Sequence, residues 1–93
     1  MDEINVTEKL IEVLQEIQSN SGYDSQGIAP ETRPLLDLEG FDSQLWPVAI
    51  SMLAKSLGVK IPNNKNIYVS EDGTQRLTIK ESAAVVCEVA TEQ

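Results

Sequence analysis

The sequence contains no histidine, and Cys87 is its only cysteine. Without histidine, the chain lacks the general base of Ser–His and Cys–His catalysis and the commonest metal-binding side chain. A lone cysteine cannot form an internal disulfide. Its neighbours Val85, Val86 and Val89 indicate a small hydrophobic side chain on or near a buried helix face rather than a reactive thiol. These absences argue against a hydrolase and against a metalloenzyme.

Basic residues are scarce: seven lysines and arginines stand against fifteen aspartates and glutamates, which gives a net charge of −8. They are scattered from Lys9 to Lys80 without forming a cluster, so no nucleic-acid partner is expected. An acidic surface instead suits basic protein partners. The sequence also lacks an apolar run of the ~20 residues that a membrane span needs, and its start, Met1-Asp2-Glu3, does not resemble a signal peptide. We therefore expect a cytoplasmic monomer.

Aromatic residues are few, with one Trp, two Tyr and one Phe, so the core has to be aliphatic. A chain of 93 residues is expected to form one domain, residues 1–93, because single domains commonly have ~100–150 residues. The first helix is predicted over residues 5–19, with Asn5 as its cap and Glu8 in a capping-box-like position. One face of this helix carries an apolar stripe that core packing explains: Val6, Leu10, Val13, Leu14 and Ile17.

A second helix is expected to start at or just after Ser43, with Asp42 or Ser43 as its cap, and to end at Gly58. Pro47 lacks the N–H that a helix interior needs, so regular hydrogen bonding is expected from about Trp46 onward. Residues 20–34 are rich in Ser, Gly, Asp, Asn, Pro and Thr, which predicts a long loop. A short helical turn is expected at 34–38.

The last part of the chain is predicted to contain a short hairpin and a final helix. Asp72-Gly73 lies between β-prone residues and suggests a turn within residues 66–77. Thr78 and Glu81 have the spacing of a capping box, after which apolar residues return at helical spacing. The predicted fold is therefore all-α, a small three- to four-helix bundle. It has a long loop between the first two long helices and a short extended or hairpin insertion before the last.

The candidate functional segment is Gly40-Phe41-Asp42-Ser43, where the loop turns into the middle helix. A serine at the positive end of a helix, beside a carboxylate, has two interpretations. It caps the N–H groups of the helix, or it presents a hydroxyl for another protein to modify. Asp42 alone is a poor base for an alcohol, so no neighbour could activate Ser43 as a nucleophile. This absence favours a modification site over a catalytic serine.

Together these residues resemble the acyl carrier protein family, also called phosphopantetheine-binding carrier domains. The resemblance covers nearly the whole chain. It rests on the first helix, the loop ending in Leu36-Asp37-Leu38-Glu39-Gly40, the Asp42-Ser43 pair, the distance from Ser43 to Ile61-Pro62, and the Thr-capped final helix. It implies a bundle of acyl-carrier type in which Ser43 bears a covalent 4′-phosphopantetheine arm. It also implies that Asp42 helps to position the magnesium ion of the transferase that attaches the arm.

The resemblance further implies a carrier that is not itself an enzyme. Such a protein holds an acyl or aminoacyl group as a thioester and presents it to loading and processing enzymes of lipid or secondary-metabolite biosynthesis. The sequence departs from the family pattern at Gln44 and Pro47, where apolar residues are usual, and it has no Asp or Glu between Ser43 and Pro62. These departures suggest a specialised set of partners. They also motivate an alternative, an unmodified interaction module of the same fold in which Ser43 is only a helix cap.

Two further side-chain positions each allow two interpretations. Trp46, beside the serine, is either partly buried in the core or an exposed partner-binding aromatic residue. The insertion at residues 66–77 is either an embellished surface loop or a segment in which Tyr68 and Val69 shape the surface over which a cargo passes.

Overall fold

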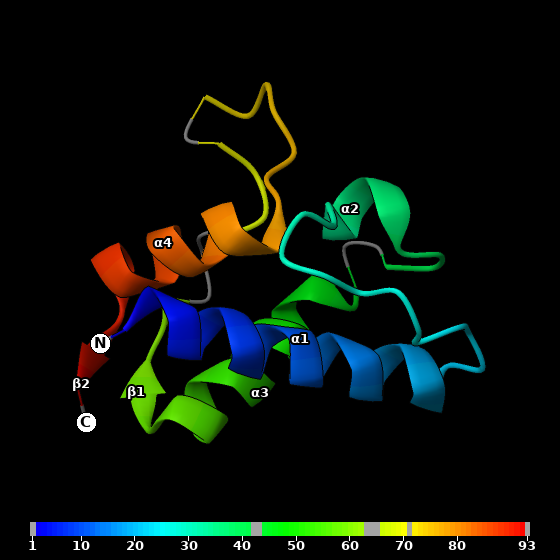
Figure 1. The fold of residues 1–93 in the computed structure, drawn as a ribbon. Helices are drawn as coiled ribbons and strands as arrows, with labels where there is room; N and C mark the ends of the chain where they lie inside the picture. Colours follow the sequence, from blue (N-terminus) through cyan, green and yellow to red (C-terminus); the bar gives the residue numbers. More distant parts are fainter. Residues whose placement is uncertain (1, 42–43, 63–65, 71, 93) are drawn as a thin grey trace.

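The fold of the chain is given by a computed structural model that describes residues 2–41, 44–62, 66–70 and 72–92. Within these ranges the elements follow in the order α1 (Glu3–Asn20), α2 (Pro34–Asp37), α3 (Trp46–Leu57), β1 (Val59–Lys60), α4 (Ile79–Val89) and β2 (Thr91–Glu92) (Figure 1). The prediction of a small helical bundle is confirmed. None of the helices in the described part of the chain is both long and apolar enough to cross a membrane.

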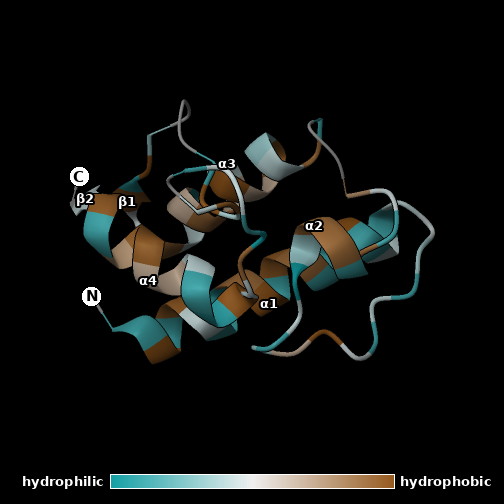
Figure 2. Ribbon diagram, turned by 90° about the horizontal axis from the view of Figure 1, so that it is seen from above, coloured by the Kyte–Doolittle hydropathy of each residue, from teal (hydrophilic) through white to brown (hydrophobic). Residues whose placement is uncertain are grey.

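Helix α1 packs against both α3 and α4 and so forms the centre of the bundle. Hydrophobic and hydrophilic residues alternate along it (Figure 2), and the entire predicted apolar stripe is buried. The predicted cap is wrong: the side chain of Asp2, not Asn5, accepts a hydrogen bond from the Ile4 N–H at 3.0 Å. The helix therefore begins two residues earlier than predicted, because Asp2 caps an N–H group of an earlier first turn.

Helix α3 begins at Trp46, and Leu45 occupies its N-cap position without a side-chain capping hydrogen bond. Asp42 and Ser43, the predicted caps, lie outside the described residues, whereas the start of regular hydrogen bonding at Trp46 is confirmed. Pro47 falls in the first turn, where its missing N–H has no intrahelical partner to lose. At the other end Gly58 adopts a left-handed φ of 69° and donates its N–H to carbonyls of the last turn, as a helix terminator does.

The start of α4 holds the long loop in place. The predicted capping box is present, with Thr78 and Glu81 each accepting a hydrogen bond from the other's backbone N–H. The next two N–H groups, those of Ile79 and Lys80, donate to the carbonyls of Thr32 and Pro30 at 2.8 and 3.0 Å. The first-turn N–H groups of α4, which have no intrahelical acceptor, thus find their partners in the loop between α1 and α2.

The insertion before α4 contributes to the core, which is more than the surface-loop interpretation expects. Val69 and Arg76 form a single antiparallel bridge around the predicted turn, so the hairpin is present in its shortest form. Ile67 and Tyr68, just before that bridge, are fully buried.

The pairing of β1 with β2 was not predicted. These two-residue strands are antiparallel, with Val59 opposite Glu92 and Lys60 opposite Thr91. The pairing joins the exit of α3 to the end of the chain, so β2 lies at the same end of the molecule as the start of α1 (Figure 1).

Candidate functional site

Ser43, the predicted attachment point, and its neighbour Asp42 lie outside the described residues. The site is therefore built from the segments on its two sides, residues 39–41 and α3 from its N-cap onward. Each of the three residues 39–41 is held by a different part of the molecule.

The carbonyl of Glu39 is held by α1. Gln18 is only 1% exposed, although it is a polar residue, and its Nε2 donates to the Glu39 carbonyl oxygen at 2.8 Å. Gln18 follows Leu14 by four residues and so extends the apolar stripe of α1. A polar side chain in line with a buried stripe is the signal that could have identified this contact from the sequence.

Gly40 lies directly under the ring of Tyr23. Its φ is +72°, which a glycine adopts without strain. A Cβ placed there would lie 2.5 Å from Tyr23 Cε2, so only a glycine leaves room for this ring. The positive φ of the backbone and the close approach of the Tyr23 ring therefore both require glycine at this position.

Phe41 anchors the segment in the core. It is 5% exposed, and its ring meets the ring of Tyr68 edge to face, with the centroids 5.4 Å apart and the planes at 88°. Edge-to-face aromatic pairs of this kind contribute about 0.5–1.5 kcal/mol beyond their buried area. The insertion before α4 therefore supports the chain immediately before Asp42 and Ser43, a role the sequence did not reveal.

On the other side of the Asp42-Ser43 pair, the side chains become accessible to solvent. Gln44 is exposed, and Trp46 is partly buried against the core, which favours the partial-burial interpretation of this aromatic residue. Two apolar side chains stand out in the solvent on neighbouring elements: Leu36 on α2 is 64% exposed and Val48 on α3 is 46% exposed. The residue before the Asp42-Ser43 pair, Phe41, is thus buried, and the residue after the pair, Gln44, is exposed.

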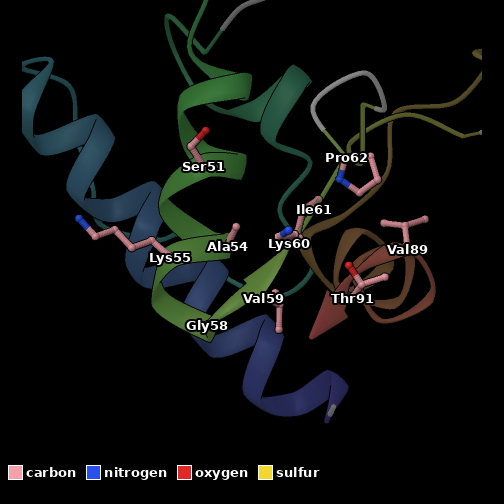
Figure 3. Close-up of a pocket in the computed structure, with 10 residues that line it drawn as sticks. All are labelled: Ser51, Ala54, Lys55, Gly58, Val59, Lys60, Ile61, Pro62, Val89 and Thr91. Carbon is pink, nitrogen blue, oxygen red and sulfur yellow. The ribbon is translucent and has the colours of Figure 1, made fainter. Parts of the chain in front are cut away.

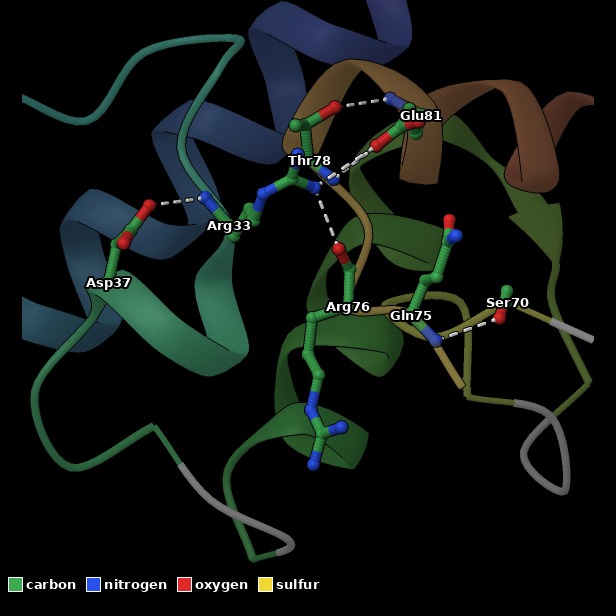
Figure 4. Close-up of polar contacts among 7 residues, drawn as sticks. All are labelled: Arg33, Asp37, Ser70, Gln75, Arg76, Thr78 and Glu81. Atoms are coloured by element: carbon green, nitrogen blue, oxygen red, sulfur yellow. Dashed lines mark hydrogen bonds and ion pairs between the residues drawn. The ribbon is translucent and has the colours of Figure 1, made fainter. Parts of the chain in front are cut away.

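A polar network ties α2 to α4 and the hairpin (Figure 4). The guanidinium of Arg33 donates to the Arg76 carbonyl at 2.8 Å and lies 3.5 Å from Glu81 Oε1. The pKa of the Glu81 carboxyl is lowered overall, mainly because its side chain accepts a hydrogen bond from the Thr78 N–H. Desolvation acts in the opposite direction, and the positive charge of Arg33 lowers the pKa further. The backbone N–H of Arg33 donates to Asp37 Oδ2 at 2.8 Å, which closes the single turn of α2.

Cys87 is partly buried, and burial, together with the carboxylates of Glu3 and Asp2, raises the pKa of its thiol. A raised pKa reduces the thiolate fraction on which cysteine reactivity depends. Across the described ranges, no three acidic or cysteine side chains gather into a group that could hold a metal ion.

Comparisons with known proteins add no assignment: no family model matches the chain, and neither a curated protein nor a solved structure matches it.

Proposed function

We propose that the protein is a discrete carrier of acyl-carrier type, with Ser43 as the attachment point of a 4′-phosphopantetheine arm. The observation that carries the proposal is the anchoring of residues 39–41. Gln18, Tyr23 and Tyr68 each hold one of them, and the next described residue, Gln44, is exposed. A modification site needs a hydroxyl that a separate enzyme can reach, on a backbone whose position is fixed on one side.

The modification is a transfer from coenzyme A. The Ser43 Oγ forms a bond to the phosphorus that bears pantetheine, the pyrophosphate P–O bond breaks, and 3′,5′-ADP leaves. The hydroxyl proton passes to a base of the transferase, whose magnesium ion Asp42 would help to position. This chain contributes the hydroxyl and no catalytic base, in keeping with the absence of histidine from its sequence.

The start of α3 supports a negatively charged phosphodiester at Ser43. Ser43 precedes the first residue of α3, Trp46, by three positions, and the N-cap residue Leu45 makes no side-chain capping hydrogen bond. The first-turn N–H groups and the helix dipole of a 12-residue helix favour negative charge in this region. Pro47 removes one of these donors, which makes the contribution smaller than in a helix without proline.

Once loaded, the arm would carry an acyl or aminoacyl group as a thioester on its terminal thiol. The protein would present this group to loading and processing enzymes and would catalyse none of their steps. Leu36 and Val48, the exposed apolar residues on either side of the candidate segment, are the side chains that such enzymes would contact first.

The test is intact mass spectrometry of the full chain after incubation with coenzyme A, Mg²⁺ and a broad-specificity phosphopantetheinyl transferase. We expect a gain of one phosphopantetheine in the wild type, no gain in Ser43→Ala, and an unchanged gain in Ser56→Ala, an exposed serine on α3. A gain that survives Ser43→Ala would overturn Ser43 as the site. The absence of any gain would favour the alternative, an unmodified interaction module.

A further inference from the structure

A groove of about 540 Å³ runs beside the first half of α1, where α4 lies along this helix (Figure 1). One wall is α1 itself. The other wall is formed by Pro30 and Glu31 of the long loop and by Lys80, the second residue of α4. The fold fixes this second wall, because the Lys80 N–H donates to the Pro30 carbonyl at 3.0 Å.

Helix α1 carries a second apolar line beside its core stripe, and this line faces the groove. Ile4, Thr7 and Ile11 all line the groove and recur at positions i, i+3 and i+7, which share one face of a helix. Ile4 is 69% exposed and Ile11 is partly buried. A single exposed isoleucine on a protein surface is ordinary. Here it continues into Ile11 and Pro30 within one groove, which makes a contiguous apolar surface.

Another groove, of about 690 Å³, lies beside β1 and the end of α3 and offers much less apolar surface (Figure 3). Its apolar residues Val59 and Ile61 are only 5% and 7% exposed. The core already covers them, so a partner would remove little further apolar area from water there. The Ile4 side chain, in contrast, leaves most of its surface to be covered.

The groove beside α1 lies in the part of the protein that carries its net charge. The first 42 residues contain ten acidic and two basic side chains, whereas the remainder contains five of each, so residues 1–42 account for the whole net charge of −8. Among the described residues that line the groove, Glu3, Glu8 and Glu31 are acidic and exposed, and Lys80 is the one basic residue. A local concentration of charge directs oppositely charged partners to one place.

Neighbouring basic side chains are already paired elsewhere. The Lys9 ammonium group lies 3.6 Å from Glu12, and the Arg33 guanidinium lies 3.5 Å from Glu81. Helix stability explains only one of the three glutamates in the groove: Glu3 is in the first turn of α1, where a carboxylate complements the helix dipole. The other two lie beyond that turn and in the loop, where the dipole gives no reason for them.

We propose that this groove is the docking site for a basic amphipathic helix of a partner protein. Apolar residues on one face of that helix pack against Ile4, Ile11 and Pro30, and its Lys or Arg side chains lie near the carboxylates of Glu8 and Glu31. An open groove suits one face of a helix, whereas a small ligand needs roughly 70–90% of its own surface covered. The proposal does not rest on the modification proposed above.

The test is a titration of the full-length ¹⁵N-labelled chain with a synthetic helical peptide, followed by amide chemical shifts. The basic probe has Leu at positions i, i+3, i+4 and i+7 and mainly Lys and Gln elsewhere. A second probe has Glu in place of Lys. We expect shifts concentrated at residues 3–11, 30–31 and 80 with the basic probe, weakened by added salt, and none there with the acidic probe.

A matched pair of apolar variants separates docking from general attraction between opposite charges. Ile4 and Leu36 are similarly exposed, at 69% and 64%, so neither Ile4→Ser nor Leu36→Ser should disturb the fold. We expect Ile4→Ser to weaken binding of the basic probe about tenfold or more and Leu36→Ser to weaken it less than about twofold.

A matched pair of charge variants separates the groove from the acidic half of the chain as a whole. Glu8→Gln/Glu31→Gln and Glu16→Gln/Glu39→Gln remove the same charge from exposed glutamates. We expect the first to weaken binding about fivefold or more and the second less than about twofold. Circular dichroism checks that each variant is folded. Shifts centred elsewhere, equal weakening by the two members of either pair, or no shifts at millimolar basic probe would each overturn the proposal.

Discussion

Replacing Gly40 by alanine tests the anchored segment most directly, because two independent penalties meet at this residue. The backbone has φ +72°, and a Cβ would lie 2.5, 2.7 and 2.8 Å from Cε2, Cζ and the hydroxyl oxygen of Tyr23. We expect Gly40→Ala to lower the free energy of unfolding by about 2–4 kcal/mol. Of this, about 1–2 kcal/mol comes from the left-handed backbone, and the remainder comes from displacing the Tyr23 ring.

Three further variants separate the two penalties. Gly22 has a similar φ of +81° but nothing within 4 Å of an added Cβ, so Gly22→Ala should show the backbone penalty alone, about 1–2 kcal/mol. Tyr23 is 37% exposed, so Tyr23→Ala should cost less than about 1 kcal/mol. When Tyr23 is already alanine, the steric penalty at Gly40 disappears. Adding Gly40→Ala to Tyr23→Ala should then lower the free energy of unfolding only by the amount found for Gly22→Ala.

The assay is urea denaturation of all four variants and the wild type, followed by circular dichroism and analysed as a double-mutant cycle. We expect Tyr23 and Gly40 to be coupled by at least about 0.5–1 kcal/mol, with the double variant more stable than the sum predicts. Equal costs at Gly40 and Gly22, or additive effects at Tyr23 and Gly40, would refute the close packing of Tyr23 over this glycine. If Ser43 is loaded as proposed, loading by a transferase should slow in Gly40→Ala and not in Gly22→Ala.

Two other expectations concern titratable side chains. Tyr68 is fully buried, and its hydroxyl has no hydrogen-bond partner among the residues that the structure describes. Tyr68→Phe should therefore keep or raise the free energy of unfolding, by up to about 1–2 kcal/mol, and a loss above about 1 kcal/mol in urea would contradict an unpaired hydroxyl. Burial also raises the pKa of Tyr68 above the ordinary value of 10.0, so the unfolded chain loses this proton first. Stability should then decline as the pH rises above that value in the wild type and decline less in Tyr68→Phe. In the hairpin turn, hydrogen bonds from the hydroxyls of Ser70 and Thr74 and from the Thr74 N–H lower the pKa of Asp72 from 3.8 to about 2. The resulting contribution to the free energy of unfolding is present at pH values above the pKa of this carboxyl in the unfolded chain. It is lost as the pH falls through the lower pKa of the folded chain. The Asp72 carboxyl resonance should therefore titrate below pH 3.8 in carbon-detected NMR, and a midpoint at the ordinary value would show that these bonds do not persist in solution.

The three long helices could be predicted from the sequence because each carries an apolar face at helical spacing. Thr78 and Gly58 marked helix ends correctly, since capping chemistry depends on residues close in sequence. The start of α1 was misjudged because Asp2 and Asn5 are both good caps, and the longer helix satisfies more backbone groups.

The contacts that hold the candidate segment could not be predicted, because they join residues far apart in sequence. Nothing in the neighbourhood of Tyr68 indicates that it meets Phe41, and short polar stretches around an Asp-Gly turn more often lie at the surface. The pairing of β1 with β2 was missed for the same reason: two-residue strands have no periodicity to detect.

The two hydrogen bonds from the first turn of α4 to the carbonyls of Thr32 and Pro30 also constrain how the chain assembles. Their partners are about fifty residues apart in sequence, so these bonds close a long loop and are expected to form later than the local hydrogen bonds within α1. The amides of Ile79 and Lys80 therefore report on this late event. In hydrogen exchange they should gain protection after the amides in the middle of α1 during refolding, and local opening of the loop should expose them without global unfolding.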